Sequence, residues 1–170
     1  MKAYIGLGAN LGDLAATLRA ALQALDGLPQ SRLLAVSSGW RSAPVDAGGP
    51  DFLNAVACLE TALAPLELLD ALQAIEQAHG RERPYRHAPR TLDLDLLLME
   101  GQVWSDARLS LPHPRLHQRA FVLHPLLELA PGLSLPGIGP LAAQLPGVAD
   151  QRLHPDGALW PAAGGGNTPP

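Results

Sequence analysis

Two aspartates separated by one leucine constrain this chain more than any other feature. They lie in the run Leu-Asp-Leu-Asp-Leu, where apolar and acidic residues alternate. Such alternation predicts a β-strand, which we place at Thr91 to Met99. The leucines then point into a core, while Asp93 and Asp95 project from the other face about 7 Å apart. The fold must therefore bury one face of this strand and leave a polar site on the other.

Two carboxylates at this spacing repel each other and resist burial unless a cation neutralises them. Magnesium prefers oxygen ligands and usually combines one or two carboxylates with substrate phosphates. An isolated Asp-x-Asp is more simply a solvated face of an edge strand, but seven of the twelve Lys and Arg residues lie between 81 and 119. Guanidinium groups bind phosphate oxygens in pairs of hydrogen bonds. Asp93, Asp95 and their cationic surroundings therefore predict a site for magnesium and a polyphosphate.

Familiar glycine-rich nucleotide motifs do not explain this site. The chain has no Gly-x-x-x-x-Gly-Lys-Ser/Thr loop, so a bound nucleotide is not held by a P-loop. The pair Gly6 and Gly8 lacks the later glycine of a dinucleotide fingerprint, and a turn leading into a helix explains it better.

The remaining pattern alternates between strands and helices. Strands are expected at 3–7, 33–40, 52–61 and 91–99, and helices at 14–27, 65–80 and 120–130. This order suggests helices packed on one face of a mainly antiparallel sheet, which is a ferredoxin-like α/β sandwich of the α+β class. We expect one domain over residues 1–155. The Pro-, Gly- and Ala-rich residues 156–170 are expected to form a disordered tail.

Composition restricts the partners. A net charge of -4 argues against binding to nucleic acid or to an anionic membrane. No window approaches the roughly 18 apolar residues of a membrane span, and the N-terminus lacks the apolar core of a signal peptide. The single cysteine, Cys58, has no partner for an internal disulfide. We expect a cytoplasmic monomer that acts on small molecules.

Several motifs, taken together and in order, resemble the 6-hydroxymethyl-7,8-dihydropterin pyrophosphokinase family of folate biosynthesis. The resemblance runs from Tyr4 to about Pro136. It rests on the opening Tyr-Ile-Gly-Leu-Gly-Ala-Asn-Leu-Gly-Asp, on Asp51-Phe-Leu-Asn-Ala-Val, on Gly-Arg-Glu-Arg leading to Pro89-Arg-Thr-Leu-Asp-Leu-Asp, and on Leu111-Pro-His-Pro-Arg-Leu-His-Gln-Arg-Ala-Phe-Val-Leu-His-Pro-Leu.

The resemblance implies a reaction and a set of residues. An intact pyrophosphoryl group passes from ATP, the co-substrate, to the hydroxymethyl oxygen of the pterin, and AMP is released. Two magnesium ions are held by Asp93 and Asp95, and catalysis also involves Arg81, Arg83 and Arg90. Nucleotide contacts are implied at Gln73, Glu76, Arg83, Arg90, Arg108, Ser110, His113 and Arg119.

The resemblance also implies a pterin pocket. On the strand at 52–61, Phe52 and Asn54 share one face, which sets an aromatic ring beside an amide that can pair with the pterin edge. The family often has tryptophan at His87, tyrosine at Phe52 and Thr-Pro at positions 42 and 43, so binding is expected to be tuned differently here. The implied pterin contacts are Ser42, Ala43, Val45, Phe52, Asn54, His87 and Phe121.

Two other functions remain open from the residues alone. A scaffold with this pocket can bind a nucleotide or a pterin without turnover, as a non-catalytic module. The same aspartates can also serve a magnesium-dependent phosphohydrolase in which water is the nucleophile. The products formed from ATP and the pterin alcohol distinguish these functions from pyrophosphoryl transfer.

Overall fold

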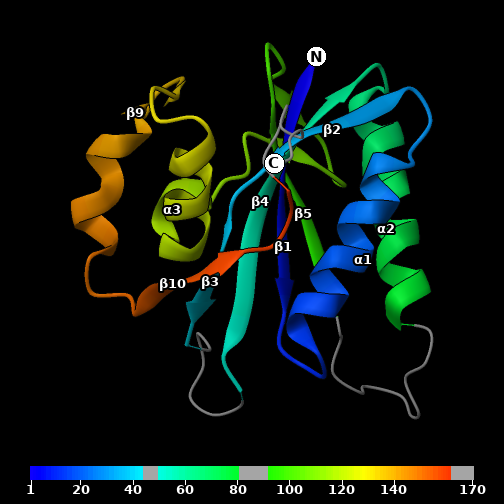
Figure 1. Cartoon of the computed structure of the whole chain (residues 1–170). Coiled ribbons are helices and arrows are strands. Elements are labelled where there is room, and N and C mark those ends of the chain that lie inside the picture. The colour runs from blue at the N-terminus through cyan, green and yellow to red at the C-terminus, as the bar shows by residue number, and fades with distance from the viewer. Residues whose placement is uncertain (44–49, 81–91, 162–170) are drawn as a thin grey trace.

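The computed structural model describes residues 1–43, 50–80 and 92–161. Its centre is a six-stranded sheet (Figure 1), in which every pairing is antiparallel among the residues described. The strands are β1 (Lys2–Ala9), β2 (Ser31–Val36), β3 (Ser38–Ser42), β4 (Phe52–Thr61), β5 (Asp93–Met99) and β10 (Leu153–Ala158). The order is β10-β3-β4-β1-β5, and β2 also pairs with β4. The predicted α+β class with a mainly antiparallel, ferredoxin-like sheet is confirmed.

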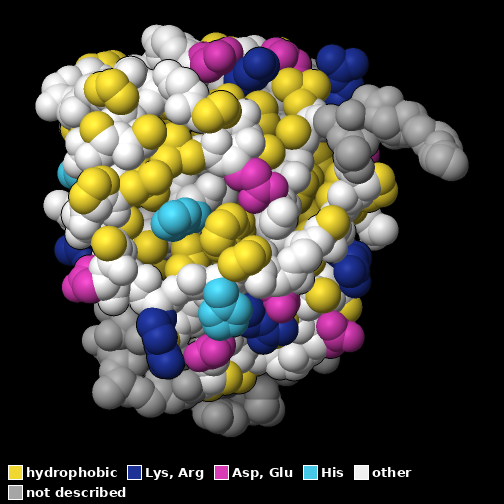
Figure 2. All heavy atoms as spheres, turned by 60° about the vertical axis from the view of Figure 1, so that its left-hand side comes forward, with side chains coloured by type: hydrophobic (Ala, Val, Ile, Leu, Met, Phe, Trp, Pro, Cys, Tyr) yellow, Lys and Arg dark blue, Asp and Glu magenta, His cyan; other side chains and the backbone are white. Residues whose placement is uncertain are grey.

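Helices cover both faces of this sheet. On one face lie α1 (Leu14–Asp26) and α2 (Pro65–Gly80), and on the other lie α3 (Ala120–Leu129) and the 3-10 helix η2 (Leu141–Val148) (Figure 1). The expectation that helices pack on one face only is therefore wrong. The C-terminal part of the chain supplies a second helical layer. Figure 2 views the molecule from the side of α3 and η2, where apolar side chains spread across much of the face.

Alternation along β4 builds a core on each side of the sheet. Leu53 and Leu59 are buried with α1 and α2, whereas Val56 and Cys58 are buried with α3. This division follows the two-residue repeat that the sequence predicts. Burial raises the pKa of the Cys58 thiol, which fits a small core residue.

The expected strand at 33–40 is interrupted at Ser37. This buried residue donates its N–H to the carbonyl of Val56 at 2.9 Å, and its Oγ accepts from the N–H of Val56 at 2.9 Å. A side-chain oxygen thus takes the place of a backbone carbonyl in the ladder. The result is two strands, β2 and β3, that pair with β4 one after the other.

An irregularity in β5 limits the alternation that the two aspartates imply. Leu94 and Leu96 face the core under α1 and α2 as predicted. Between Tyr4 and Ile5 of β1 the register then shifts, so that Leu97 and Leu98 turn to the core under α3. The face of β5 that carries Asp93 and Asp95 at the start of the strand therefore carries Leu97 and Leu98 after the bulge.

The C-terminal section contains short elements before β10. They are β6 (Trp104–Ser105), β7 (Ser110–Leu111), the 3-10 helix η1 (Leu116–Gln118), β8 (Ser134–Leu135) and β9 (Gly139–Pro140). The disordered tail was expected to begin at residue 156, but β10 continues to Ala158 and Leu159 is buried against the core. Residues 162–170 lie outside the described part, so disorder there stays a prediction. No described helix is long and apolar enough to cross a membrane.

Candidate active site

The two aspartates lie on an open part of the sheet, opposite two glycines of β1. Asp93 pairs with Gly8 and Asp95 with Gly6, and on the other side of β1 Gly8 pairs with Asn54 of β4. Both glycines are thus inside a strand, and the interpretation of Gly8 as part of a turn is wrong. Because glycine has no side chain, β1 leaves the sheet surface free between Asn54 and Asp93 for a ligand to approach.

Two cavities meet at this carboxylate pair. The first, which we call the sheet cavity, has a volume of about 410 Å³ and is lined by Phe52, Asn54 and Phe121. The second, the α2 cavity, has a volume of about 430 Å³ and lies against α2 and β7. Three residues line both cavities, namely Asp93, Asp95 and His113. The two cavities therefore adjoin at these side chains.

The structure distributes the predicted residues between these two cavities. The sheet cavity contains the described pterin candidates Ser42, Ala43, Phe52, Asn54 and Phe121, together with Arg119. The α2 cavity contains the nucleotide candidates Gln73, Glu76, Arg108 and Ser110. Arg119 was predicted among the nucleotide residues but does not line the α2 cavity. The candidates outside the described residues are Val45, Arg81, Arg83, His87 and Arg90.

The amide of Asn54 has a defined orientation. Its Nδ2 donates to the carbonyl of Trp40 at 3.0 Å and to Oγ of Ser42 at 2.8 Å. A backbone carbonyl only accepts, so the nitrogen must be on that side. Oδ1 therefore lies toward Gly8, where a Cβ on that glycine would meet it at 3.5 Å. Asn54 presents a hydrogen-bond acceptor to the sheet cavity.

His113 is held as a donor where the cavities meet. The ring Nδ1 accepts from the backbone N–H of Arg115 at 3.1 Å, and the backbone N–H of His113 donates to the carbonyl of Leu97 at 2.7 Å. Burial lowers the pKa of His113; Asp95 acts in the opposite direction, and Arg119 and Arg115 lower it further. A neutral ring whose Nδ1 accepts must carry its proton on Nε2. His113 can therefore donate to an anionic oxygen without adding a charge.

Glu76 connects α2 to the strand that carries the aspartates. Its Oε2 accepts from the backbone N–H of Leu94 at 2.7 Å. Leu94 stands between Asp93 and Asp95 on an edge strand. This hydrogen bond satisfies the Leu94 N–H, which would otherwise lack a partner at the sheet edge. It also fixes α2 beside the segment of β5 that carries Asp93 and Asp95.

Arg108 is positioned by two aspartates that the sequence did not single out as site residues. Its Nη2 donates to Oδ1 of Asp70 at 2.6 Å and to Oε1 of Gln73 at 3.2 Å. Its backbone N–H donates to Oδ1 of Asp106 at 2.8 Å, and Nε1 of Trp104 donates to Oδ2 of Asp106 at 2.9 Å. These bonds lower the pKa of the Asp106 carboxyl, the indole contributing most. The run Ser105-Asp-Ala-Arg108 is typical of a turn, and this signal could have identified Asp106 from the sequence.

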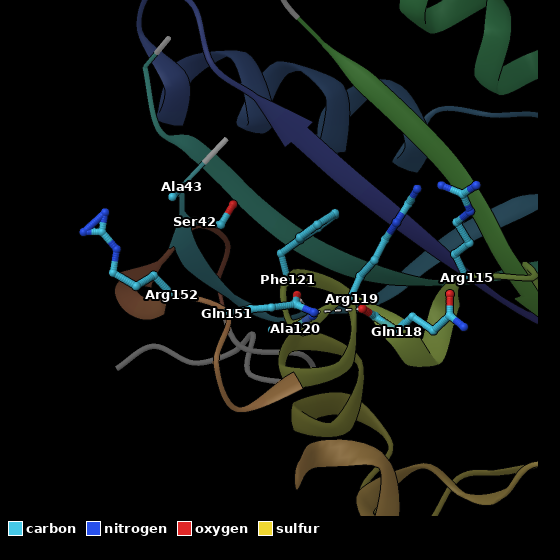
Figure 3. Close-up of a pocket in the computed structure, with 9 residues that line it drawn as sticks. All are labelled: Ser42, Ala43, Arg115, Gln118, Arg119, Ala120, Phe121, Gln151 and Arg152. Carbon is cyan, nitrogen blue, oxygen red and sulfur yellow. Dashed lines mark hydrogen bonds between the residues drawn. The ribbon is translucent and has the colours of Figure 1, made fainter. Parts of the chain in front are cut away.

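Arg119 and Phe121 form the other wall of the sheet cavity. They stand at the start of α3, and Figure 3 shows both side chains extending toward the sheet. The Cζ atom of Arg119 lies 5.7 Å from the centroid of the Phe121 ring, within the range of a cation–π contact. An aromatic ring and a guanidinium group thus face the strands that carry Asn54 and the aspartates.

Comparisons with known proteins identify the family. Residues 4–131 match the family model described as 7,8-dihydro-6-hydroxymethylpterin-pyrophosphokinase (HPPK). The 2-amino-4-hydroxy-6-hydroxymethyldihydropteridine pyrophosphokinase of Pseudomonas aeruginosa is 52% identical over 136 residues, which are 79% of this chain and 84% of that protein. The enzyme of that name from Haemophilus influenzae is 43% identical over 154 residues, which are 90% of this chain and 96% of that protein.

A solved structure shows the same fold. The Plasmodium falciparum protein HPPK-DHPS superposes with a TM-score of 0.62 at 13% identity, and the match covers 84% of this chain and 42% of that chain. At this identity the likeness concerns the fold alone. The family model and the two bacterial relatives decide the classification. This chain belongs to the 7,8-dihydro-6-hydroxymethylpterin-pyrophosphokinase family.

Proposed function

We propose that this chain transfers the pyrophosphoryl group across Asp93 and Asp95, from ATP in the α2 cavity to a pterin in the sheet cavity. As a member of its family, the chain is an ATP-dependent pyrophosphokinase that acts on 6-hydroxymethyl-7,8-dihydropterin in folate biosynthesis. One observation supports the assignment of sites above all others. The two aspartates line both cavities, so each substrate has its own side of the carboxylate pair.

The sheet cavity is proposed to bind the pterin ring. Oδ1 of Asn54 accepts from an N–H of the ring edge, because the Asn54 nitrogen is already used by Trp40 and Ser42. Phe52 and Phe121 supply apolar and aromatic surface for a flat heterocycle. Ala43 borders the same cavity. From the family resemblance we also assign Val45 and His87, outside the described residues, to this pocket.

The α2 cavity is proposed to bind the nucleotide. Gln73, Glu76, Arg108 and Ser110 line it with hydrogen-bonding groups. His113 adds a neutral Nε2–H donor for a phosphate oxygen, and the cationic Arg119 approaches the same oxygens from the sheet cavity. Further phosphate contacts are assigned from the resemblance to residues outside the described part, namely Arg81, Arg83 and Arg90.

Asp93 and Asp95 are proposed to hold two magnesium ions. In the described ranges no group of three acidic, histidine or cysteine side chains surrounds a common point, so phosphates and water would complete the ligand shell. Magnesium commonly binds in this way, with few carboxylates and several substrate oxygens. When bound, it neutralises phosphate charge during in-line transfer. The exposure of Asp95 and the partial exposure of Asp93 leave room for such ligands.

The contribution of the chain is mainly positioning and fixed charge. The hydroxymethyl oxygen of the pterin attacks the β-phosphorus of ATP, and the bond to the AMP oxygen breaks. Asn54 and the two phenylalanines orient the nucleophile, while Arg119 and His113 stabilise charge on the transferred group. We also propose that the protein acts as a cytoplasmic monomer without nucleic-acid or membrane partners, in keeping with its net charge of -4.

Phosphorus NMR tests the proposed reaction directly. The protein is incubated with magnesium, ATP and 6-hydroxymethyl-7,8-dihydropterin, and the phosphorus signals are followed with time. AMP and a pterin pyrophosphate should appear together in equal amounts. Formation of ADP or free phosphate would identify another reaction, and the absence of turnover would favour a non-catalytic binding module.

A further inference from the structure

A third cavity lies beside the sheet cavity at the start of α3 (Figure 3), with a volume of about 550 Å³. We call it the arginine cavity. It shares Ser42, Ala43, Arg119 and Phe121 with the sheet cavity, and it shares no lining residue with the α2 cavity. A ligand in the arginine cavity would thus adjoin a ligand in the sheet cavity and not one in the α2 cavity.

The described lining of the arginine cavity is positively charged. Among the residues that the structure describes, its charged lining residues are Arg115, Arg119 and Arg152, and none of its described lining residues is a carboxylate. The ion pairs found in the described ranges involve none of these three arginines. Guanidinium groups gathered at one cavity without an anion repel one another, and an anionic ligand relieves that repulsion.

Two hydrogen bonds of the Gln151 side chain connect the two sides of the arginine cavity, which are the segment before β10 and the start of α3. Nε2 of Gln151 donates to the carbonyl of Gln118 at 2.9 Å, and Oε1 of Gln151 accepts from the N–H of Ala120 at 2.8 Å. This side chain therefore joins the segment before β10 to the start of α3. Figure 3 shows Arg115 and Arg119 extending in the same direction toward the sheet, with Arg152 on the opposite side of Phe121.

The position of Arg152 follows from the strand that comes after it. Leu153 pairs with Ser42, so Arg152 stands beside the end of β3, where the sheet cavity begins. The match to the family model ends at residue 131. Gln151 and Arg152 therefore lie beyond the segment that the family model matches.

We propose that the arginine cavity binds the pyrophosphate group of the pterin product after it leaves the aspartates. The proposal rests on the pyrophosphokinase reaction, in which a neutral pterin alcohol becomes a pterin with several negative charges. Arg119 lines both the sheet cavity and the arginine cavity, so its guanidinium group can contact the pyrophosphate in either one. Guanidinium groups pair well with phosphate oxygens, so this subsite distinguishes the product from the substrate by charge.

The test compares two arginine variants with a matched control. Arg115→Ala and Arg152→Ala remove one charge each from the arginine cavity, and Arg32→Ala removes one charge from an exposed position on β2 that lines none of the three cavities. Isothermal titration calorimetry measures the affinity for the pterin alcohol, the pterin pyrophosphate and inorganic pyrophosphate, all without nucleotide. Thermal unfolding shows whether each variant is folded, and Arg152→Lys provides a variant that keeps the charge.

In each cavity variant the affinity for the pterin pyrophosphate should fall about three- to tenfold, a range set by the exposure of these arginines to solvent and salt. The affinity for the alcohol should change less than twofold, and Arg152→Lys should restore most of the loss. Arg32→Ala should bind all ligands as the unmodified chain does. Added salt should weaken binding of the product more than binding of the alcohol.

Three results would overturn the proposal: unchanged product affinity in both cavity variants, equal losses for the alcohol and the product, or an equal loss in Arg32→Ala. A loss confined to inorganic pyrophosphate also counts against it, since the subsite would then serve a free anion. Failure of the reaction itself is a separate result. It would appear as missing pterin pyrophosphate in the phosphorus NMR assay, while these binding measurements use product prepared independently.

Discussion

The hydroxyl of Ser42 should control the pterin site through Asn54. Ser42→Ala removes the acceptor that Nδ2 of Asn54 meets at 2.8 Å. Both residues are buried, with exposures of 7% and 4%, so water does not readily replace the lost partner. A buried neutral hydrogen bond contributes about 1 kcal/mol net, and an unsatisfied donor costs up to about 3 kcal/mol. Because Nδ2 keeps its bond to Trp40, we expect the free energy of unfolding to fall by about 1–2 kcal/mol.

The same change should weaken pterin binding about three- to tenfold, because the Asn54 amide is then less well oriented. Urea unfolding measures the stability, and calorimetry with 6-hydroxymethyl-7,8-dihydropterin measures the affinity. Ser42→Thr keeps the hydroxyl and should retain both properties. In an Asn54→Ala background, Ser42→Ala should have a smaller effect, since the two residues act as a unit. Wild-type stability and affinity in Ser42→Ala, or additive effects in the double variant, would refute this role.

Three further predictions concern other parts of the fold. The Glu128 carboxylate accepts from Ser38 N at 2.8 Å, Ser38 Oγ at 2.9 Å and Trp40 Nε1 at 3.1 Å. Glu128→Ala should lower the free energy of unfolding in urea by about 1–2 kcal/mol, and an unchanged midpoint would exclude a role in holding α3 to β3. Burial lowers the pKa of His113, so the NMR signals of its ring should show a titration midpoint below pH 6.5 when no nucleotide is bound. Because the unfolded chain then takes up this proton more readily than the folded chain, the free energy of unfolding should fall as the pH drops below 6.5. A titration midpoint above 6.5 would contradict the neutral donor. Burial raises the pKa of Tyr4 from 10.0 to about 12. The protonated Tyr4 side chain should therefore contribute to the free energy of unfolding below pH 10, and this contribution should be lost as the pH rises toward 12. Ultraviolet absorbance of a Tyr4 phenolate near pH 10 would contradict this.

Local patterns predicted the elements that form from nearby residues. The strand at 52–61 was predicted with its observed bounds, and the helices expected at 14–27 and 65–80 correspond to α1 and α2. Asp13 directly precedes α1 and caps it, since its side chain accepts from the N–H of Ala16 at 3.1 Å. Each of these features depends on a repeat or a cap that lies within one segment of the chain.

Elements that depend on distant partners were not predicted. The residues of β10 read Leu-His-Pro-Asp-Gly-Ala, which is a poor strand sequence by propensity, but β3 offers an open edge with which they pair. The break at Ser37 likewise arises from its bonds to Val56. The placement of α3 on the second face depends on how the chain crosses the sheet after β5, and no local repeat encodes it.

The chemistry of the site was predictable in part. Alternation identified Asp93 and Asp95, because the period of a strand decides which side chains share a face. It did not reveal that Gly6 and Gly8 keep the neighbouring sheet surface clear, since a glycine pair also suits a turn. The orientation of Asn54, the proton position on His113 and the support of Arg108 by Asp106 all depend on contacts made only in the folded chain.

The central proposal is that Asp93 and Asp95 bind the metal ions between the two substrates. Manganese can replace magnesium at oxygen ligands and is observed by electron paramagnetic resonance. The number of bound manganese ions is to be measured in the presence of a non-hydrolysable ATP analogue, for the unmodified chain and for Asp93→Asn and Asp95→Asn. We predict two ions per chain and fewer in each variant, with unchanged thermal unfolding. Variants that fold normally and still bind two ions would contradict the role of this carboxylate pair.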